Sequence, residues 1–302
     1  ANETVPLKER LWDRVNYSGI VHDIAIVANG AVWLQESSIT ASVSGEGRNS
    51  ALTIHSLLNS GLITKLEGDT SSVPISYGKS SITHFIEIIN LQTNTTVATS
   101  ERQSIPVESN RLFPVTTKMI VPGTQLWSPD APNMYMARMV TMYGSTLVDE
   151  SFVPFGLRDI EIIEGKFFLN GSEYFLKGLT YVEHSPRHGR SITHKEIERD
   201  ILLIKNTGAN AIRFTSGSVH PYYYSMCNKY GLLVFQDINV NGVPSQLLGS
   251  SPLQTSAINT LKEMMSRDFN NPSLIGIGLA QGIDGGTEGY GQYITNLSEQ
   301  LG

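Results

Sequence analysis

Acidic, basic and amide side chains follow short apolar runs in the second half of the sequence, between residues 183 and 288. Carboxylates can accept or donate a proton during a reaction, and charged groups give strong hydrogen bonds to polar ligands. Side chains of these types can therefore carry out acid–base chemistry or hold a polar molecule. The candidates are Glu183, His184, Arg213, Gln236, Asp237, Gln281, Asp284 and Glu288.

Three histidines, His184, His188 and His194, lie close together in the sequence and invite a metal-site interpretation. Pro186 separates the first two, and no cysteine or dense acidic group accompanies them. We therefore interpret them as solvated loop side chains and predict no metal and no other cofactor. The single cysteine, Cys227, shares a helical face with two tyrosines, which predicts a buried, unreactive thiol.

The first half of the sequence shows the alternation of apolar and polar residues that is typical of strands with one buried face. Turn-rich stretches such as residues 44–50 and 92–96 separate the runs, and no segment has helical periodicity. Residues 1–157 are therefore predicted to form an all-β sandwich of immunoglobulin type. The alternating residues are Ile24 and Ile26; Leu52, Ile54 and Leu58; Ile82, Ile86 and Ile88; and Met136, Val140 and Met142.

Residues 158–302 show a different pattern, in which strands alternate with helices. A hairpin is predicted around the Asn170–Gly171 turn, because both residues tolerate the positive φ of a type I′ turn. Thr193 and Glu196 form a capping box that starts a helix, and Gly208 ends it. Further strands are predicted at 175–179, 210–214, 232–237 and 274–279, with helices over 221–231, around 258–265 and over 290–301. Four β/α units in series predict a parallel sheet, half of an eight-unit (β/α) barrel.

Several segments in this order resemble glycoside hydrolase family 2, the family of β-galactosidases, β-glucuronidases and β-mannosidases. They are YSGIVHDIAI (17–26), LWSPDAPNMY (126–135), FGLR (155–158), FLNG (168–171) with KG (177–178), RD (199–200), NAIR (210–213), YGL (230–232) and RDFNNPS (267–273). The resemblance covers most of the chain. It implies an immunoglobulin-like domain followed by the first half of a TIM barrel.

The same resemblance implies that a catalytic carboxylate is missing. Family members carry a Glu that acts as general acid/base in a W-x-x-G-N-E segment at the end of the fourth barrel strand. Counting from Pro272 places Gln281 at the Asn position and Gly282 at the Glu position. The family's nucleophile, a Glu at the end of strand seven, and its sugar-binding domain before the sandwich are expected outside these residues. Asp284 and Glu288 are candidates for a displaced acid, although the glycine-rich setting favours a loop that would hold a proton donor poorly.

Two residues keep positions that the family uses at its strand ends. Arg213 can bond a sugar hydroxyl or fix a neighbouring carboxylate in an ion pair, and both interpretations stay open. Asp237 can cap a loop or contact sugar. If carbohydrate binds, we expect it at Arg213 and Asp237, with Gln236, Glu183, His184 and Gln281 as further contacts, and we expect low affinity.

The formal net charge of −6, without a block of Lys or Arg, argues against a nucleic-acid partner. No apolar run is long enough for a membrane span, and residues 1–6 have no signal-peptide character. The missing initiator Met suggests a processed protein or an excised piece, so the compartment stays open. A sheet of four strands leaves two unpaired edges, from which we expect a homo-oligomer formed through the open half barrel.

Three functions are consistent with these observations. The chain can be a family member without catalysis that keeps weak carbohydrate binding, a structural or adhesive module of a larger protein, or an active glycosidase whose missing residues lie elsewhere. Gly282 argues against the third in its usual form.

Overall fold

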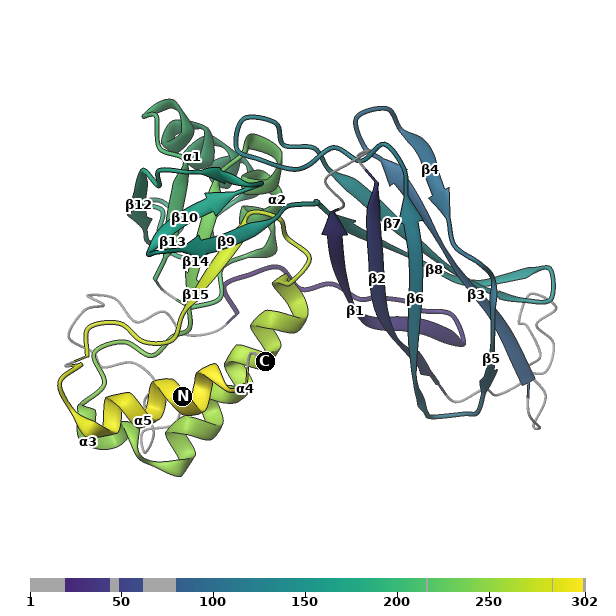
Figure 1. Cartoon of the computed structure of the whole chain (residues 1–302). Helices are drawn as coiled ribbons and strands as arrows, with labels where there is room; N and C mark the ends of the chain where they lie inside the picture. Colours follow the sequence, from purple (N-terminus) through teal and green to yellow (C-terminus); the bar gives the residue numbers. More distant parts are fainter. Residues whose placement is uncertain (1–19, 44–48, 62–79, 216, 284, 301–302) are drawn as a thin grey trace. The chain divides into compact units, whose positions relative to one another are not determined.

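The computed structural model describes residues 20–43, 49–61, 80–215, 217–283 and 285–300 (Figure 1). The chain divides into two compact units, one of residues 25–173 and one of residues 174–302 together with the chain up to residue 24. We call them the sandwich and the half barrel. The domain boundary at 157/158 stays a prediction; the units divide after the hairpin of residues 160–173. Asn170 Nδ2 donates to Trp127 O at 3.0 Å within the sandwich unit.

The sandwich contains two antiparallel sheets of the kind that the alternating residues predict. In strand β2, buried and exposed or partly exposed residues alternate along the whole strand, so one face carries the core. Ile54, Ile86 and Ile88 lie in this core and are fully buried. One sheet has the order β1 (Val32–Val43), β2 (Ser50–Ser60), β6 (Leu112–Val121), and the other has β4 (Thr95–Thr99), β3 (Ser80–Asn90), β7 (Tyr135–Tyr143), β8 (Thr146–Phe155), with β5 (Gln103–Val107) also on β3.

Two details of the sandwich differ from the sequence-based expectation. Residues 22–30 form no strand, and Ile24 and Ile26 are 74% and 100% exposed, because alternation alone cannot supply a pairing partner. In β7, Met136 and Met142 are only partly buried, while Tyr135 on the other face belongs to the core. The predicted turn at 44–50 lies largely outside the described residues.

A three-stranded hairpin sheet follows the two large sheets. It has the order β11 (Ser172–Glu173), β10 (Lys166–Leu169), β9 (Ile160–Ile163). Asn170 and Gly171 take φ values of 53° and 76°, which confirms the predicted positive-φ turn between β10 and β11.

The half barrel contains a four-stranded parallel sheet with the order β12 (Gly178–Tyr181), β13 (Ala211–Phe214), β14 (Leu233–Asp237), β15 (Leu274–Gly278). The helices are α1 (His194–Asn206), α2 (Pro221–Tyr230), α3 (Ser245–Leu248), α4 (Ser251–Asp268) and α5 (Glu288–Ser298). Four β/α units therefore follow one another, as the sequence predicts. Helix α3 was not predicted, because four residues are too few to show periodicity. Among the described residues, no helix is long and apolar enough to cross a membrane.

Helices α1 and α2 cover one face of the sheet. Ile212, Phe214 and Val234 from the strands pack in one buried cluster with residues of both helices, including Ile201 and Cys227. Cys227 is fully buried, and burial raises the pKa of its thiol, as expected for an unreactive cysteine. Since successive side chains of a strand point to opposite faces, Arg213, Phe235 and Asp237 lie on the other face, which we call the inner face.

Candidate functional site

The inner face carries an ion pair at the C-terminal ends of β13 and β14. Arg213 Nε lies 3.1 Å from both carboxylate oxygens of Asp237, and Arg213 Nη2 lies 2.8 Å from Asp237 Oδ2. The Asp237 side chain is 1% exposed and the Arg213 side chain is 44% exposed. The ion pair that one interpretation of Arg213 expected is therefore present, and the outer edge of the guanidinium faces solvent.

Two glycines of β15 make room for the inner-face side chains of β14. A Cβ at Gly278 would lie 2.1 Å from Asp237 Oδ1, and a Cβ at Gly276 would lie 2.7 Å from the Phe235 ring. Contacts this short do not occur between real atoms, so the carboxylate and the ring lie across the backbone of β15. Glycine at these two positions allows Asp237 to take the orientation in which Arg213 binds it.

Gln236 lies on the opposite face of the sheet from this ion pair. Its amide is fully buried and donates to Gly217 O at 2.5 Å and to Asp237 O at 3.0 Å, and it accepts from the Tyr224 hydroxyl at 3.4 Å. These bonds tie the end of β14 to the loop after β13. The structure therefore does not bring Gln236 to Arg213, because a shift of one residue along a strand reverses the face.

Glu183 follows β12 and is almost completely buried. Its carboxylate accepts hydrogen bonds from His22 Nε2 at 3.1 Å, Arg190 Nη2 at 3.4 Å and the backbone N–H of His220 at 3.4 Å. This side chain therefore joins three segments of the half barrel. The neighbouring His184 is exposed.

The segment after β15 contains Gln281 and Gly282. Gln281 pairs with Asn241 through an isolated parallel bridge and through Asn241 Nδ2, which donates to Gln281 Oε1 at 3.3 Å. Gly282 has a φ of +62°, and a Cβ there would lie 3.3 Å from Asn241 Oδ1. Glycine takes this left-handed backbone without strain, whereas other residues rarely do. Asp284 lies outside the described residues, and Glu288 is the first residue of α5.

A cavity of about 620 Å³ lies in the loop after β12 and at the start of α1, apart from the inner-face ion pair. Arg187, Lys195 and Arg199 give its lining a basic character. The predicted capping box is present in this lining: Glu196 N donates to Thr193 Oγ1, and Thr193 N donates to Glu196. The backbone N–H of Thr193 and then the Ser185 hydroxyl lower the pKa of Glu196 to about 2.

Comparison with known proteins assigns segments of both units to the same family. Residues 160–301 match the TIM barrel domain of the glycosyl hydrolases family 2, and residues 63–158 match the glycosyl hydrolases family 2. The chain belongs to glycosyl hydrolase family 2.

Solved structures of family 2 proteins share the fold at low sequence identity. A β-galacturonidase from Eisenbergiella tayi bound to glycerol has a TM-score of 0.75 and 20% identity, over 90% of this chain and 44% of its own. A family 2 member from Bacteroides cellulosilyticus has a TM-score of 0.74 and 21% identity, over 90% and 35%. A Bacteroides uniformis β-glucuronidase has a TM-score of 0.70 and 21% identity, over 88% and 30%. The chain thus spans less than half the length of each.

Three residues near the strand ends of this family 2 fold were not predicted from the sequence: His22, Asp23 and His220. His22 contacts Glu183, and Asp23 lies beside His194 and His220. The His194 side chain is 52% exposed, as expected for a solvated residue, but it begins α1 instead of lying in a loop, and its neighbours are His220 and Asp23 rather than His184 and His188. The only sequence signal was that His22 and Asp23 lie in the segment 17–26 that resembles the family. Burial, followed by the charges of His22 and His194, lowers the pKa of His220.

Proposed function

We propose that this family 2 chain binds carbohydrate weakly at its strand ends and does not hydrolyse glycosidic bonds by itself. The observation that carries the proposal is Gly282. It stands where the family resemblance expects the acid/base Glu, and its backbone takes the left-handed conformation that disfavours any side chain.

The chemistry of glycoside cleavage explains why this position matters. A retaining glycosidase uses two carboxyl groups roughly 5–5.5 Å apart, one of which protonates the leaving oxygen. Gly282 has no group that can do so. Glu183 and Asp237 accept hydrogen bonds from Arg190 and Arg213, so neither is placed as a proton donor.

Arg213 and Phe235 support the binding part of the proposal. They are opposite each other in the pairing of β13 with β14 and lie on the same inner face. The partly exposed guanidinium offers charge-assisted hydrogen bonds to hydroxyl groups, and the partly buried ring offers an apolar surface beside it. Asp237 holds the guanidinium in one orientation. A single such cluster predicts low affinity, because few polar contacts would be made.

The test combines an activity assay with a binding titration on residues 1–302. We expect no turnover of aryl β-galactosides, β-glucuronides or β-mannosides above the buffer blank between about pH 4 and pH 8, where carboxylic acids and histidines change charge. Sugars at millimolar concentration should shift NMR signals of the half barrel. Arg213→Ala should abolish the shifts, while Arg138→Ala, which removes an arginine paired with Glu87 and Glu150 in the sandwich, should not.

Three results would contradict this proposal. Turnover lost in Asp284→Asn or Glu288→Gln would show a displaced acid. Binding unaffected by Arg213→Ala would place the sugar elsewhere. No binding at any tested sugar concentration would favour the structural or adhesive role.

We also propose that the polypeptide of residues 1–302 self-associates through its half barrel. In the described sheet, β12 and β15 are each paired on one side only, and unpaired strand edges attract further strands. Thr180→Lys, which places a charge on the inner face of the edge strand β12, should reduce the mass measured by light scattering. Thr40→Lys on β1 of the sandwich is the matched control, and an equal effect of both would rule out this interface.

A further inference from the structure

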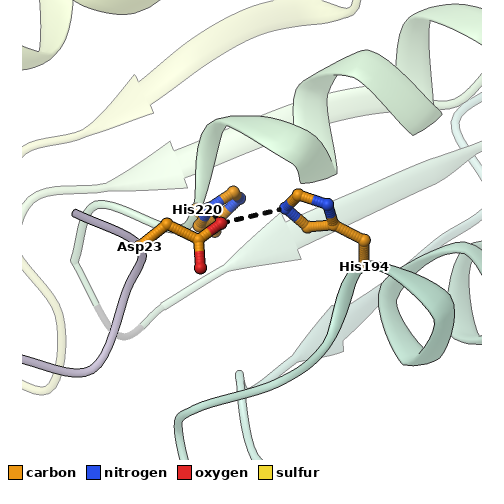
Figure 2. A group of neighbouring side chains, drawn as sticks. All are labelled: Asp23, His194 and His220. Atoms are coloured by element: carbon orange, nitrogen blue, oxygen red, sulfur yellow. Dashed lines mark ion pairs between the residues drawn. The ribbon is translucent and has the colours of Figure 1, made fainter. Parts of the chain in front are cut away.

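Three side chains from separate segments of the half barrel meet beside the start of α1 and α2 (Figure 2). Asp23 comes from the chain before the sandwich, His194 is the first residue of α1, and His220 is the N-cap of α2. One ligand atom from each lies within 4.8 Å of the other two. The three residues are far apart in the sequence, so only the fold brings them together.

We propose that Asp23, His194 and His220 form a binding site for a divalent transition metal, with Zn²⁺ as the best fit. Two imidazoles and one carboxylate are donors that Zn²⁺ prefers. Three protein ligands with water in the fourth position are a common arrangement for this ion.

Two of the three ligand–ligand distances match the spacing of ligands around a metal and are long for charge-assisted hydrogen bonds. His194 Nε2 lies 3.3 Å from Asp23 Oδ2, and His220 Nε2 lies 3.4 Å from the same oxygen. Charge-assisted N–H···O bonds are shorter, about 2.7–2.9 Å. Ligands at about 2.0–2.1 Å from a tetrahedral Zn²⁺ are roughly 3.3 Å apart, since the edge of a tetrahedron is about 1.6 times the bond length.

Neighbouring side chains hold the two imidazoles in place. The His194 ring stacks on Tyr222, with a centroid distance of 4.2 Å and an interplanar angle of 19°. The His22 ring meets the His220 ring edge-on at 5.2 Å, and His22 itself binds the buried Glu183. Because these contacts already orient the two imidazoles, the side chains lose less conformational entropy when a metal binds.

One hydrogen bond must change when the metal binds. His220 Nδ1 accepts from the backbone N–H of Tyr222 at 3.1 Å, which caps α2. A neutral imidazole that binds a metal through Nε2 carries its proton on Nδ1 and cannot accept there. Metal binding therefore breaks this cap hydrogen bond. The affinity for Zn²⁺ is consequently lower than the three ligands would give without this loss. The bound metal would link the segment at Asp23 to the first turns of α1 and α2.

The test is a calorimetric titration of residues 1–302 with Zn²⁺ after removal of metals with a chelator. We expect saturable binding of one Zn²⁺ per chain and none of Mg²⁺, which prefers oxygen ligands. Co²⁺ in the same site should give the intense visible absorption of tetrahedral coordination. Zn²⁺ should also raise the melting temperature, because it binds only the folded chain.

Three variants remove one ligand each. Asp23→Ala, His194→Ala and His220→Asn should each weaken Zn²⁺ binding at least about tenfold. Asn is a good N-cap residue, so His220→Asn removes the ligand while it keeps the cap of α2. His188→Ala is the matched control, because His188 is an exposed histidine of the same unit that pairs with Glu196.

Folding is checked by melting each variant in the presence of chelator, where all should resemble the parent chain. The proposal is overturned by the absence of saturable binding up to about 1 mM Zn²⁺, where binding is too weak for a built site. It is also overturned if His220→Asn and Asp23→Ala bind like the parent, or if His188→Ala loses as much affinity as they do, which would indicate adsorption to surface histidines.

Discussion

The sandwich and the half barrel each bury an ionisable side chain, but only the one in the half barrel is paired with an opposite charge. In the sandwich core, His84 is fully buried, its Nδ1 lies 3.3 Å from the Thr141 hydroxyl, and its Nε2 has no partner among the described residues. In the half barrel, Asp237 is equally buried but is bound by Arg213. The sandwich thus holds a buried histidine without an opposite charge beside it, whereas the half barrel pairs a buried carboxylate with an arginine at its strand ends.

This difference indicates where function can reside. A packed apolar core fixes the shape of a domain and offers nothing to a ligand, while paired charges at the ends of parallel strands lie where barrel enzymes place their active groups. Substitutions in the sandwich should therefore change stability alone. Substitutions at the strand ends of the half barrel should change stability less and binding more.

The largest effect should come from Ile86→Ala, because Ile86 is fully buried in the sandwich core. Loss of the side chain and the cavity left behind should lower the free energy of unfolding by about 2–5 kcal/mol. Phe235→Ala on the inner face should lower the free energy of unfolding by less than Ile86→Ala does, and it should weaken sugar binding. Urea unfolding in a Trp12→Phe background checks this: the remaining tryptophans, Trp33 and Trp127, report on the sandwich, and helical circular dichroism reports on the half barrel, which holds all described helices.

If Ile86→Ala shifted the unfolding midpoints of both signals equally, the two units would unfold together, and the expectation that sandwich substitutions affect the sandwich alone would be wrong. If it weakened sugar binding as Phe235→Ala does, the functional contrast would fail as well.

The second prediction concerns the pH dependence of the sandwich. Burial lowers the pKa of His84 to about 4, from 6.5 in a solvated histidine. Between these values the unfolded chain binds a proton that the folded chain does not, so the free energy of unfolding falls as the pH falls from 6.5 to 4. The loss should approach roughly 3 kcal/mol. It should vanish in His84→Leu and persist in His55→Leu, which removes an exposed histidine of β2. An unchanged slope in His84→Leu would contradict the assignment.

The third prediction concerns the strand-end geometry of the half barrel. Gly278→Ala would place its methyl group 2.1 Å from Asp237 Oδ1, so the carboxylate must move. We expect a loss of about 1–3 kcal/mol in the free energy of unfolding, together with weaker sugar binding. Gly249→Ala is the control, since Gly249 has a φ of −75° and nothing within 4 Å of the added atom. Equal stability of the two variants would show that the ion pair adapts freely.

Much of the half barrel could be predicted because its local signals agree with one another. The capping box at Thr193 and Glu196 marks the start of α1, and Gly231, with a φ of +72°, ends α2 where a glycine was expected. Arg213 and Asp237 could be placed at strand ends from the apolar runs before them. These features depend on residues close together in the sequence, where spacing alone carries the information.

The remainder depends on contacts that spacing does not encode. The alternation at Ile24 and Ile26 looks like a strand, but none of the described strands pairs with it. Gln236 looked like a neighbour of Arg213, yet it faces the helices. Asp23 meets His194 and His220 only because the chain before the sandwich lies against the half barrel's helices, which no local pattern can show.

The smallest predicted effect is at the start of α1. Thr193→Ala removes the hydroxyl that accepts from Glu196 N, and loss of an N-cap costs about 1 kcal/mol, while Thr193→Ser should keep the cap. The pKa of Glu196 is lowered to about 2, so its part of the capping box is intact above about pH 4.5 and is lost as the pH falls toward 2. The sandwich should weaken earlier, from pH 6.5. Near pH 5, tryptophan fluorescence of a Trp12→Phe chain should therefore show a destabilisation that His84→Leu removes. The helical circular dichroism, which also follows the lowered pKa of His220, should be the same with and without His84→Leu, and a change of both signals on this substitution would show that one acid-sensitive group governs both units.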